Sequence, residues 1–135
     1  MEKILKIEEV SNVQHTPEGG WKSHYDGYKV VTDAQEIFIL VSNGQSCCES
    51  YGYVVSEDDV QSFVGTDLTD VKVVDTGVNE KMVEAGQSLD CGDIMFVNLE
   101  TNKGTLQFAV YNAHNGYYGH HGVVESVQIK KEVDL

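Results

Sequence analysis

The feature that most restricts how this chain can fold is a series of short runs in which β-prone apolar residues often alternate with polar ones. Segments rich in Gly, Asn and Asp separate the runs, and the chain has a single proline. The pattern predicts an α+β fold that is mostly β, with an antiparallel sheet of about six to seven strands and one short helix. The runs cover residues 3–10, 28–32, 36–41, 51–55, 68–76, 94–100, 105–111 and 123–130.

Two connections between these runs predict hairpins. Asp33-Ala34-Gln35 joins run 28–32 to run 36–41, and the second of these is apolar on both faces, as expected of a central strand. Asn102-Lys103-Gly104 forms a second tight connection, with Gly at the position that needs a positive φ. By contrast, residues 11–26 are of mixed polarity, and we expect a loop or an irregular hairpin there.

The helix is expected at about 57–64. Ser56 can act as its N-cap, and the acidic residues that follow favour the positive end of a helix. Val60, Phe63 and Val64 would form one apolar face, and Gly65 would end the helix. Residues 77–92 have weak periodicity and are expected to form a loop, although Met82 and Ala85 have a helical spacing over a short stretch.

The length and cysteine content predict one domain spanning residues 1–135 in a reducing compartment. A chain of 135 residues can bury a sizeable core without metal or disulfide bonds. The three cysteines are odd in number, and Cys47 and Cys48 are adjacent, which is a poor disulfide framework. The sequence shows neither a signal peptide nor a membrane-spanning stretch, so a cytoplasmic location is expected.

The net charge of −13 restricts the partners. Binding to a nucleic-acid polymer or to a membrane surface needs a basic face, and nine Lys and Arg against 22 Asp and Glu provide little material for one. The acidity is explained most simply by a soluble, self-repelling surface. An alternative is a surface that imitates nucleic acid and binds a basic host protein.

The first segment that stands out is Gly-Gln-Ser-Cys-Cys-Glu at 44–49. It follows the predicted central strand, so Gln45, Cys48 and Glu49 are candidate ligand contacts. Adjacent strand residues point to opposite faces, and one of the two cysteines can simply belong to the core. Because Glu49 disfavours a thiolate, a catalytic cysteine is not the preferred interpretation.

The second segment is Asn-Ala-His-Asn-Gly-Tyr-Tyr-Gly-His-His-Gly at 112–122. One interpretation is a Gly-rich hairpin loop whose tyrosines pack over the sheet edge. The other is a binding loop, in which tyrosine rings stack on a planar group while hydroxyl, amide and imidazole groups supply hydrogen bonds. The candidate ligand contacts in this segment are Asn112, His114, Asn115, Tyr117, Tyr118 and His120.

We expect neither a metal nor a cofactor. The chain has enough Cys and His ligands for zinc, but it lacks a C-x₂-C pair, and His114 and His120 have no cysteine pair to match. The phosphate-binding, dinucleotide-binding and nucleophile motifs of common enzymes are also missing.

On these motifs the chain resembles a family of small proteins from phages and bacteria that carries no assigned activity. The resemblance spans about residues 27–127 and implies a single-domain protein of phage or mobile-element origin, acting in the host cytoplasm. The doubled His120-His121 is a point at which relatives can differ, so His121 carries less weight. The matching pieces are Gly27-Tyr28, 43–49, Gly52-Tyr53, 56–59, Phe63, Gly65, 93–98, Glu100-Thr101, 103–108 and 111–120.

The leading functional hypothesis is an accessory protein that binds a small nucleotide-like ligand, for example to sequester a host immune signal, in a pocket that often goes with a homo-oligomer. The net charge opposes an anionic ligand unless Lys22, Lys29 or Lys103 lines the site. One alternative is a hydrolase or phosphodiesterase that uses His114 or His120 in acid–base catalysis. Another is an acidic inhibitor of a basic protein, whose affinity would collapse with salt and would not depend on Tyr117 or Tyr118.

Overall fold

The computed structural model describes residues 2–15, 23–42, 50–87, 92–113, 121–126 and 130–134. Within these ranges nine strands form one antiparallel sheet in the order β4-β7-β6-β5-β1-β2-β3-β8-β9. The predicted fold class, mostly β with little helix, is confirmed. The strands are β1 (Glu2–His15), β2 (Ser23–Thr32), β3 (Glu36–Ser42), β4 (Ser50–Val55), β5 (Asp67–Val74), β6 (Gly92–Thr101), β7 (Gly104–Ala113), β8 (His121–Glu125) and β9 (Lys130–Asp134).

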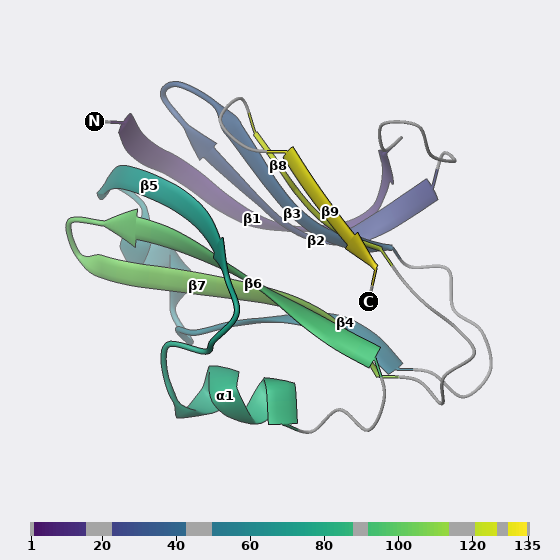
Figure 1. Ribbon diagram of the computed structural model, residues 1–135. Helices are drawn as coiled ribbons and strands as arrows, with labels where there is room; N and C mark the ends of the chain where they lie inside the picture. The colour runs from purple at the N-terminus through teal and green to yellow at the C-terminus, as the bar shows by residue number, and fades with distance from the viewer. Residues whose placement is uncertain are drawn as a thin grey trace.

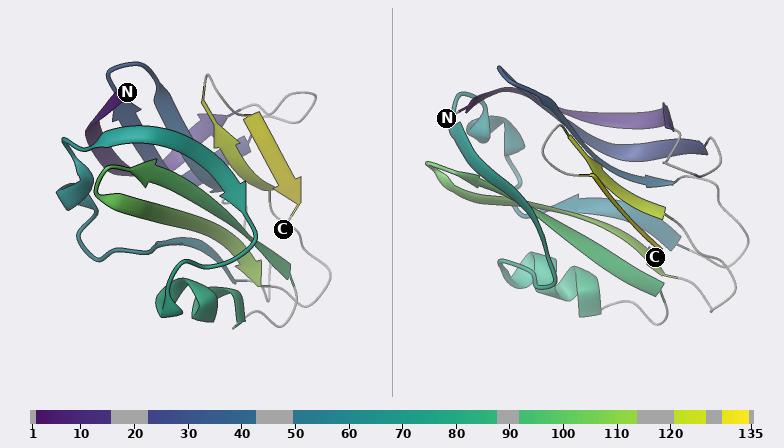
Figure 2. Two further views of the ribbon diagram at one scale, coloured as in Figure 1. Left: turned by 60° about the vertical axis from the view of Figure 1, so that its left-hand side comes forward. Right: turned by 45° about the horizontal axis from the view of Figure 1, so that its top comes forward.

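The sheet is bent into two layers (Figure 1). The lower layer is β4-β7-β6-β5 and the upper layer is β1-β2-β3-β8-β9, and within the described ranges their strands pair with each other where Glu2 and Lys3 lie opposite Leu68 and Asp67. Farther along β1, Glu9 accepts a hydrogen bond of 2.6 Å from the Tyr53 hydroxyl of β4, the opposite edge of the lower layer. β1 therefore crosses the lower layer from one edge to the other, and Figure 2 shows this arrangement from two further sides.

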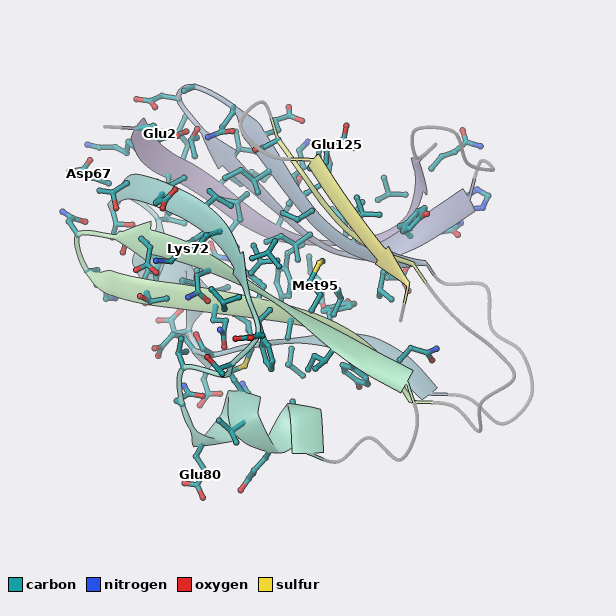
Figure 3. The ribbon with its side chains drawn as sticks, in the orientation of Figure 1. Glu2, Asp67, Lys72, Glu80, Met95 and Glu125 are labelled. Atoms are coloured by element: carbon teal, nitrogen blue, oxygen red, sulfur yellow. The ribbon has the colours of Figure 1, made fainter. Side chains whose placement is uncertain are left out.

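The main core lies between the two layers. Strand residues alternate between faces, and Leu106, Phe108 and Val110 of β7 point inward, where each is 0 % exposed. Figure 3 shows Met95 of β6 in the same space. The upper layer contributes the opposing apolar side chains, Ile4, Ile7, Val30, Ile37, Ile39, Val41 and Val124.

The outer face of the lower layer is covered by the helix α1 (Glu80–Gln87), where the sequence predicted a loop. Asn79 caps this helix, since its side-chain oxygen accepts a 3.1 Å hydrogen bond from the amide of Met82. Met82 is fully buried against Phe96 and Ala109. The helix is short and its apolar stripe is narrow, which is why periodicity alone did not reveal it.

The buried side chain of Gln107 links the segment before α1 to the sheet through hydrogen bonds. Its side-chain nitrogen donates to the Thr76 carbonyl at 2.9 Å and to the Asn98 side chain at 2.8 Å. Its side-chain oxygen accepts from the amide of Val78 at 3.0 Å. Both ends of this buried amide are therefore satisfied, as burial requires.

The prediction of a helix at about 57–64 was wrong, because this segment contains a 3-10 turn, η1 (Val60–Phe63), and no α-helix. Ser56 does not cap it, because its amide and hydroxyl both bond to the backbone of Gln107 and extend the β4–β7 pairing. Asp59, at the N-cap position, makes no side-chain capping hydrogen bond. None of the helices in the described ranges has the length and hydropathy of a transmembrane helix.

The two expected hairpins are present. β2 and β3 pair up to Val31 and Glu36, and β6 and β7 meet at Thr101 and Gly104, whose φ is +131°. Residues 11–26 were expected to form a loop or an irregular hairpin, and the described ones, 11–15 and 23–26, pair with each other in antiparallel as the ends of β1 and β2. This pairing has a register shift between Val10 and Val13, where Asn12 adopts a φ of +55°.

Candidate functional site

Only one of the predicted ligand contacts, Asn112, is among the described residues. The structure can therefore test the strands that border the two predicted segments, but not the side chains of the remaining contacts. The predicted contacts that lie outside the described residues are Gln45, Cys48, Glu49, His114, Asn115, Tyr117, Tyr118 and His120.

The strands that border the two segments are neighbours. Segment 43–49 connects β3 to β4, and segment 114–120 connects β7 to β8. β4 pairs with β7, with Ser50 opposite Ala113, and β3 pairs with β8, with Val41 opposite Gly122. The four strand ends lie at one end of the molecule, which we call the site end (Figure 1). The opposite end, with the turns at 33–35 and 102–103, is the hairpin end.

The inner face of the lower layer becomes polar toward the site end. Along β7, the apolar series at 106, 108 and 110 ends at Asn112, which is 0 % exposed. On the neighbouring β4, Val55 is followed on the same face by Tyr53, which lies opposite Val110 in the register. Asn112 is thus one row closer to the site end than Tyr53.

The inner face of the upper layer changes in the same way. Val30 of β2 is fully buried, and the next inward positions are Tyr28 and Asp26, which pair with Ile39 and Val41. On β1, the inward position after Ile7 is Glu9, opposite Tyr28. At the end where the two predicted segments begin, the upper layer therefore changes from apolar to aromatic and acidic, and the lower layer changes from apolar to aromatic and amide side chains.

These side chains form one connected cluster, which we call the tyrosine–acid cluster: Glu9, Asp26, Tyr28 and Tyr53. The rings of Tyr28 and Tyr53 meet edge to face, with centroids 5.3 Å apart and an angle of 83°. Tyr28 also contacts the core ring of Phe108 at 4.8 Å. The Tyr53 hydroxyl donates to Glu9, and Asp26 accepts a 2.8 Å hydrogen bond from the amide of Asn12.

The cluster keeps both tyrosine hydroxyls protonated. Burial raises the pKa of Tyr53 far above its ordinary value, and the hydrogen bond to Glu9 and the nearby Glu9 and Asp26 charges raise it further. The pKa of Tyr28 is also raised, by burial and then by the charge of Glu9. The two phenols can therefore donate hydrogen bonds but are poorly suited to proton transfer near neutral pH.

Two of the lysines that could have lined a site for an anionic ligand lie away from the site end. Lys29 lies on the outer side of the upper layer, 3.6 Å from the carboxylate of Glu36 and over the ring of Phe38. Lys103 is at the hairpin end, where it covers the Phe63 ring at 4.7 Å and donates to the Ser62 carbonyl. Lys22 lies outside the described residues.

A separate hollow of about 470 Å³ opens at the hairpin end. Glu2, Asp33, Leu68 and Thr69 are among its lining residues, and Figure 3 labels Glu2 and Asp67 in this part of the molecule. Glu2 is engaged there by the Thr32 hydroxyl at 2.5 Å and the Gln35 amide at 2.7 Å. Within the described residues, no group of three or more His, Cys, Asp or Glu side chains is placed to hold a metal ion.

The sequence analysis missed the tyrosine–acid cluster. Its members lie at strand positions where the alternation predicts apolar residues. This break in the alternation is the feature of the sequence that could have revealed the cluster. Two of them follow a glycine, in Gly27-Tyr28 and Gly52-Tyr53. At Gly27 a Cβ would lie 2.0 Å from the backbone oxygen of Ile39, so only glycine lets β2 and β3 approach this closely.

Comparison with known proteins identifies a family but no characterised relative. The model of a family described as Domain of unknown function (DUF7448) matches residues 2–124 of this sequence. No curated protein matches the sequence, and no solved structure does. The match covers both predicted segments and all four members of the tyrosine–acid cluster.

Proposed function

The chain belongs to the DUF7448 family, a domain of unknown function, and from this premise we propose that it is a binding module that holds a small nucleotide-like ligand without turning it over. One observation carries the proposal. The inner faces of both layers change from apolar to aromatic and polar at the site end, next to the strand ends that border 43–49 and 114–120.

The chemistry of the site end suits a planar ligand with hydrogen-bonding edges. Tyr28 and Tyr53 offer ring surface and phenol groups, and the carboxylates of Glu9 and Asp26 accept hydrogen bonds. In this proposal the bordering segments add further aromatic and polar contacts. Those contacts are Gln45, Cys48, Glu49, Asn112, His114, Asn115, Tyr117, Tyr118 and His120.

The biological role in this proposal is sequestration. The sequence resemblance suggests an accessory protein of phage or mobile-element origin, and a small protein of this kind can act by removing a host nucleotide signal. Within the tyrosine–acid cluster, the raised pKa values of Tyr28 and Tyr53 support hydrogen-bond donation by these two phenols rather than acid–base chemistry. Hydrolysis by His114 or His120 remains the alternative outcome of the test.

The test is to incubate purified protein with host-cell extract, re-isolate it, release bound small molecules and identify them by mass spectrometry. We expect an intact nucleotide-like compound that also raises the melting temperature of the protein. Tyr53→Leu should weaken its binding about tenfold or more, because stacking on a tyrosine contributes roughly 1–3 kcal/mol per base. Tyr111→Leu is the matched control, since Tyr111 lies on the adjacent strand and on the opposite face.

Two results would contradict the proposal. Protein that emerges with nothing bound, and that shows no thermal shift with nucleotides or nucleosides, would exclude this ligand class. A ligand that is released as a cleaved product, with cleavage lost in His114→Ala or His120→Ala, would show that the protein is an enzyme instead.

A further inference from the structure

The hollow at the hairpin end lies between the β2–β3 turn and the first residues of β5. Its volume of about 470 Å³ falls within the range of about 300–1,000 Å³ that is usual for small-molecule pockets. Glu2, Asp33 and Thr69 bring side-chain oxygens to its wall, and Ala34 and Leu68 bring hydrocarbon surface. The hollow is at the opposite end of the molecule from the strand ends that border the two predicted segments.

The two carboxylates of the hollow are held in place by neutral donors. Glu2 accepts a hydrogen bond of 2.5 Å from the Thr32 hydroxyl and one of 2.7 Å from the side-chain nitrogen of Gln35. Asp33 accepts a hydrogen bond of 3.1 Å from the backbone amide of Lys3. A hydroxyl and two amides orient a carboxylate without cancelling its charge, so both carboxylates keep their negative charge in a fixed position.

Within the described residues, neither Glu2 nor Asp33 forms an ion pair. Lys3 is the nearest lysine in the chain, but successive side chains of a strand point to opposite faces, so its ammonium group lies on the other face of β1 from Glu2. The ion pairs that lysines form in the described ranges involve other acids, namely Glu8, Glu36, Asp58 and Glu100. The hollow therefore has two negative charges and, in this part of the chain, no positive one.

Gln35 adds a buried acceptor beside Glu2. Its side chain is only 7 % exposed, and its side-chain oxygen has no hydrogen-bond donor among the described residues. Buried amide oxygens are normally paired, so the polar group that is missing beside Glu2 is a donor. Thr69 does not supply one to the hollow, because its hydroxyl donates to the carbonyl of Glu100 at 3.0 Å.

We propose that this hollow binds a small organic cation, in which a guanidinium or ammonium group is carried on a short alkyl stem. The N–H groups of the cation donate to the carboxylates of Glu2 and Asp33, and such charge-assisted hydrogen bonds are among the strongest in proteins. The stem lies against Ala34 and Leu68. The net charge of −13 attracts a cation to the protein from a distance. This is a second site, with a ligand class opposite in charge to a nucleotide.

The experiment is a titration of the isotope-labelled full chain with butylguanidinium and with butylammonium, followed by amide chemical shifts in about 20 mM salt. Butylurea is the matched neutral probe, because it has nearly the same shape as butylguanidinium and also has N–H donors. Each probe is taken to about 50 mM, since so small a ligand binds weakly. Tighter binding of one of the two cations identifies the preferred head group.

The variants are Glu2→Gln, Asp33→Asn and the double variant, all of which keep an oxygen that can accept the same hydrogen bond. The matched control is Glu80→Gln/Glu84→Gln, which removes the same charge from α1 on the outer face of the lower layer. Thermal unfolding of each variant checks that the fold is retained, and the two single variants carry the test if the double variant does not fold.

We expect saturable shifts at the amides of Ala34, Leu68 and Thr69 with at least one cation. Butylurea should bind about tenfold more weakly than butylguanidinium or not at all, because it lacks the charge. The double variant should bind the cation about tenfold more weakly than the unaltered protein, and each single variant should lose about threefold. The α1 control should change the affinity less than about twofold, because its charges are far from the hollow.

Three results would overturn the inference. The first is the lack of a saturable shift at these amides with either cation. The second is butylurea binding as tightly as butylguanidinium, which would mean that the hollow does not select positive charge. The third is an equal loss of affinity in the α1 control and in the double variant, which would show an effect of net charge alone. None of these results bears on the nucleotide-like ligand proposed for the site end.

Discussion

Tyr53 connects the two layers through a single side chain. It packs against the main core, meets Tyr28 edge to face and donates a hydrogen bond from its hydroxyl to Glu9 on the crossing strand β1. Burial, the hydrogen bond to Glu9 and the neighbouring carboxylates all favour the neutral phenol, and they raise its pKa. The folded protein therefore holds this proton more tightly than the unfolded chain does.

This predicts how stability depends on alkaline pH. The contribution of Tyr53 is fully present below its unfolded pKa of 10.0 and is lost as the pH rises toward the folded value. The free energy of unfolding should fall above about pH 10, and it should fall less steeply in Tyr53→Phe, which has no proton to lose. Urea denaturation between about pH 8 and 11 measures both slopes. Equal slopes in the two proteins would show that the Tyr53 proton is not held more tightly in the fold.

At the scale of elements, the close approach of β2 to β3 depends on Gly27. A side chain at this position would meet the Ile39 carbonyl, which belongs to the backbone of the neighbouring strand and cannot rotate away. At Gly52 the corresponding contact is the Tyr111 hydroxyl, 2.9 Å away, which is the far end of a flexible side chain. Substitution of the glycine should therefore be tolerated less well in Gly27-Tyr28 than in Gly52-Tyr53.

Gly27→Ala should destabilise the protein by about 1–3 kcal/mol or more, as overpacking against a rigid neighbour does. Gly52→Ala should cost less than about 1 kcal/mol, because the Tyr111 ring can shift. Urea denaturation followed by circular dichroism measures both. A Gly27→Ala protein as stable as Gly52→Ala would mean that β2 and β3 can separate without penalty, contrary to the pairing of Gly27 with Leu40.

The sequence predicted most of the strands because the alternation of apolar and polar residues is a local signal. The single final strand expected at 123–130 was wrong, since β8 ends at Glu125 and β9 begins at Lys130 and pairs back with it. It failed at the helices, where the decisive contacts are distant in sequence. Ser56 looked like a helix cap but is bound to Gln107, and the capped helix follows Asn79 instead. A single sequence does not show which of two capping residues is already engaged by another strand.

The same limit applies to the candidate site. Asn112 was identified from its segment, and the structure places it on the inner face at the site end. The breaks in alternation at the positions of the tyrosine–acid cluster are visible in the sequence, but their meeting is not, because Glu9 reaches Tyr53 only when β1 crosses from β5 to β4. The contacts predicted at 45–49 and 114–120 lie outside the described residues and stay predictions.

At the scale of the whole molecule, the two ends of the layered sheet differ. The hairpin end carries the β1–β5 junction and the hollow beside Glu2 and Leu68. The site end carries the tyrosine–acid cluster and borders both predicted segments. The central claim is that a small nucleotide-like ligand binds at the site end and not at the hairpin end.

The measurement that tests this claim most directly is a titration of isotope-labelled protein with adenosine, followed by amide chemical shifts in assigned two-dimensional NMR spectra. The account predicts saturable shifts that cluster at Tyr28, Tyr53 and Asn112, with the amides of Leu68 and Thr69 unchanged. Spectra that do not change at millimolar adenosine, or shifts centred on the hollow at the hairpin end, would contradict it.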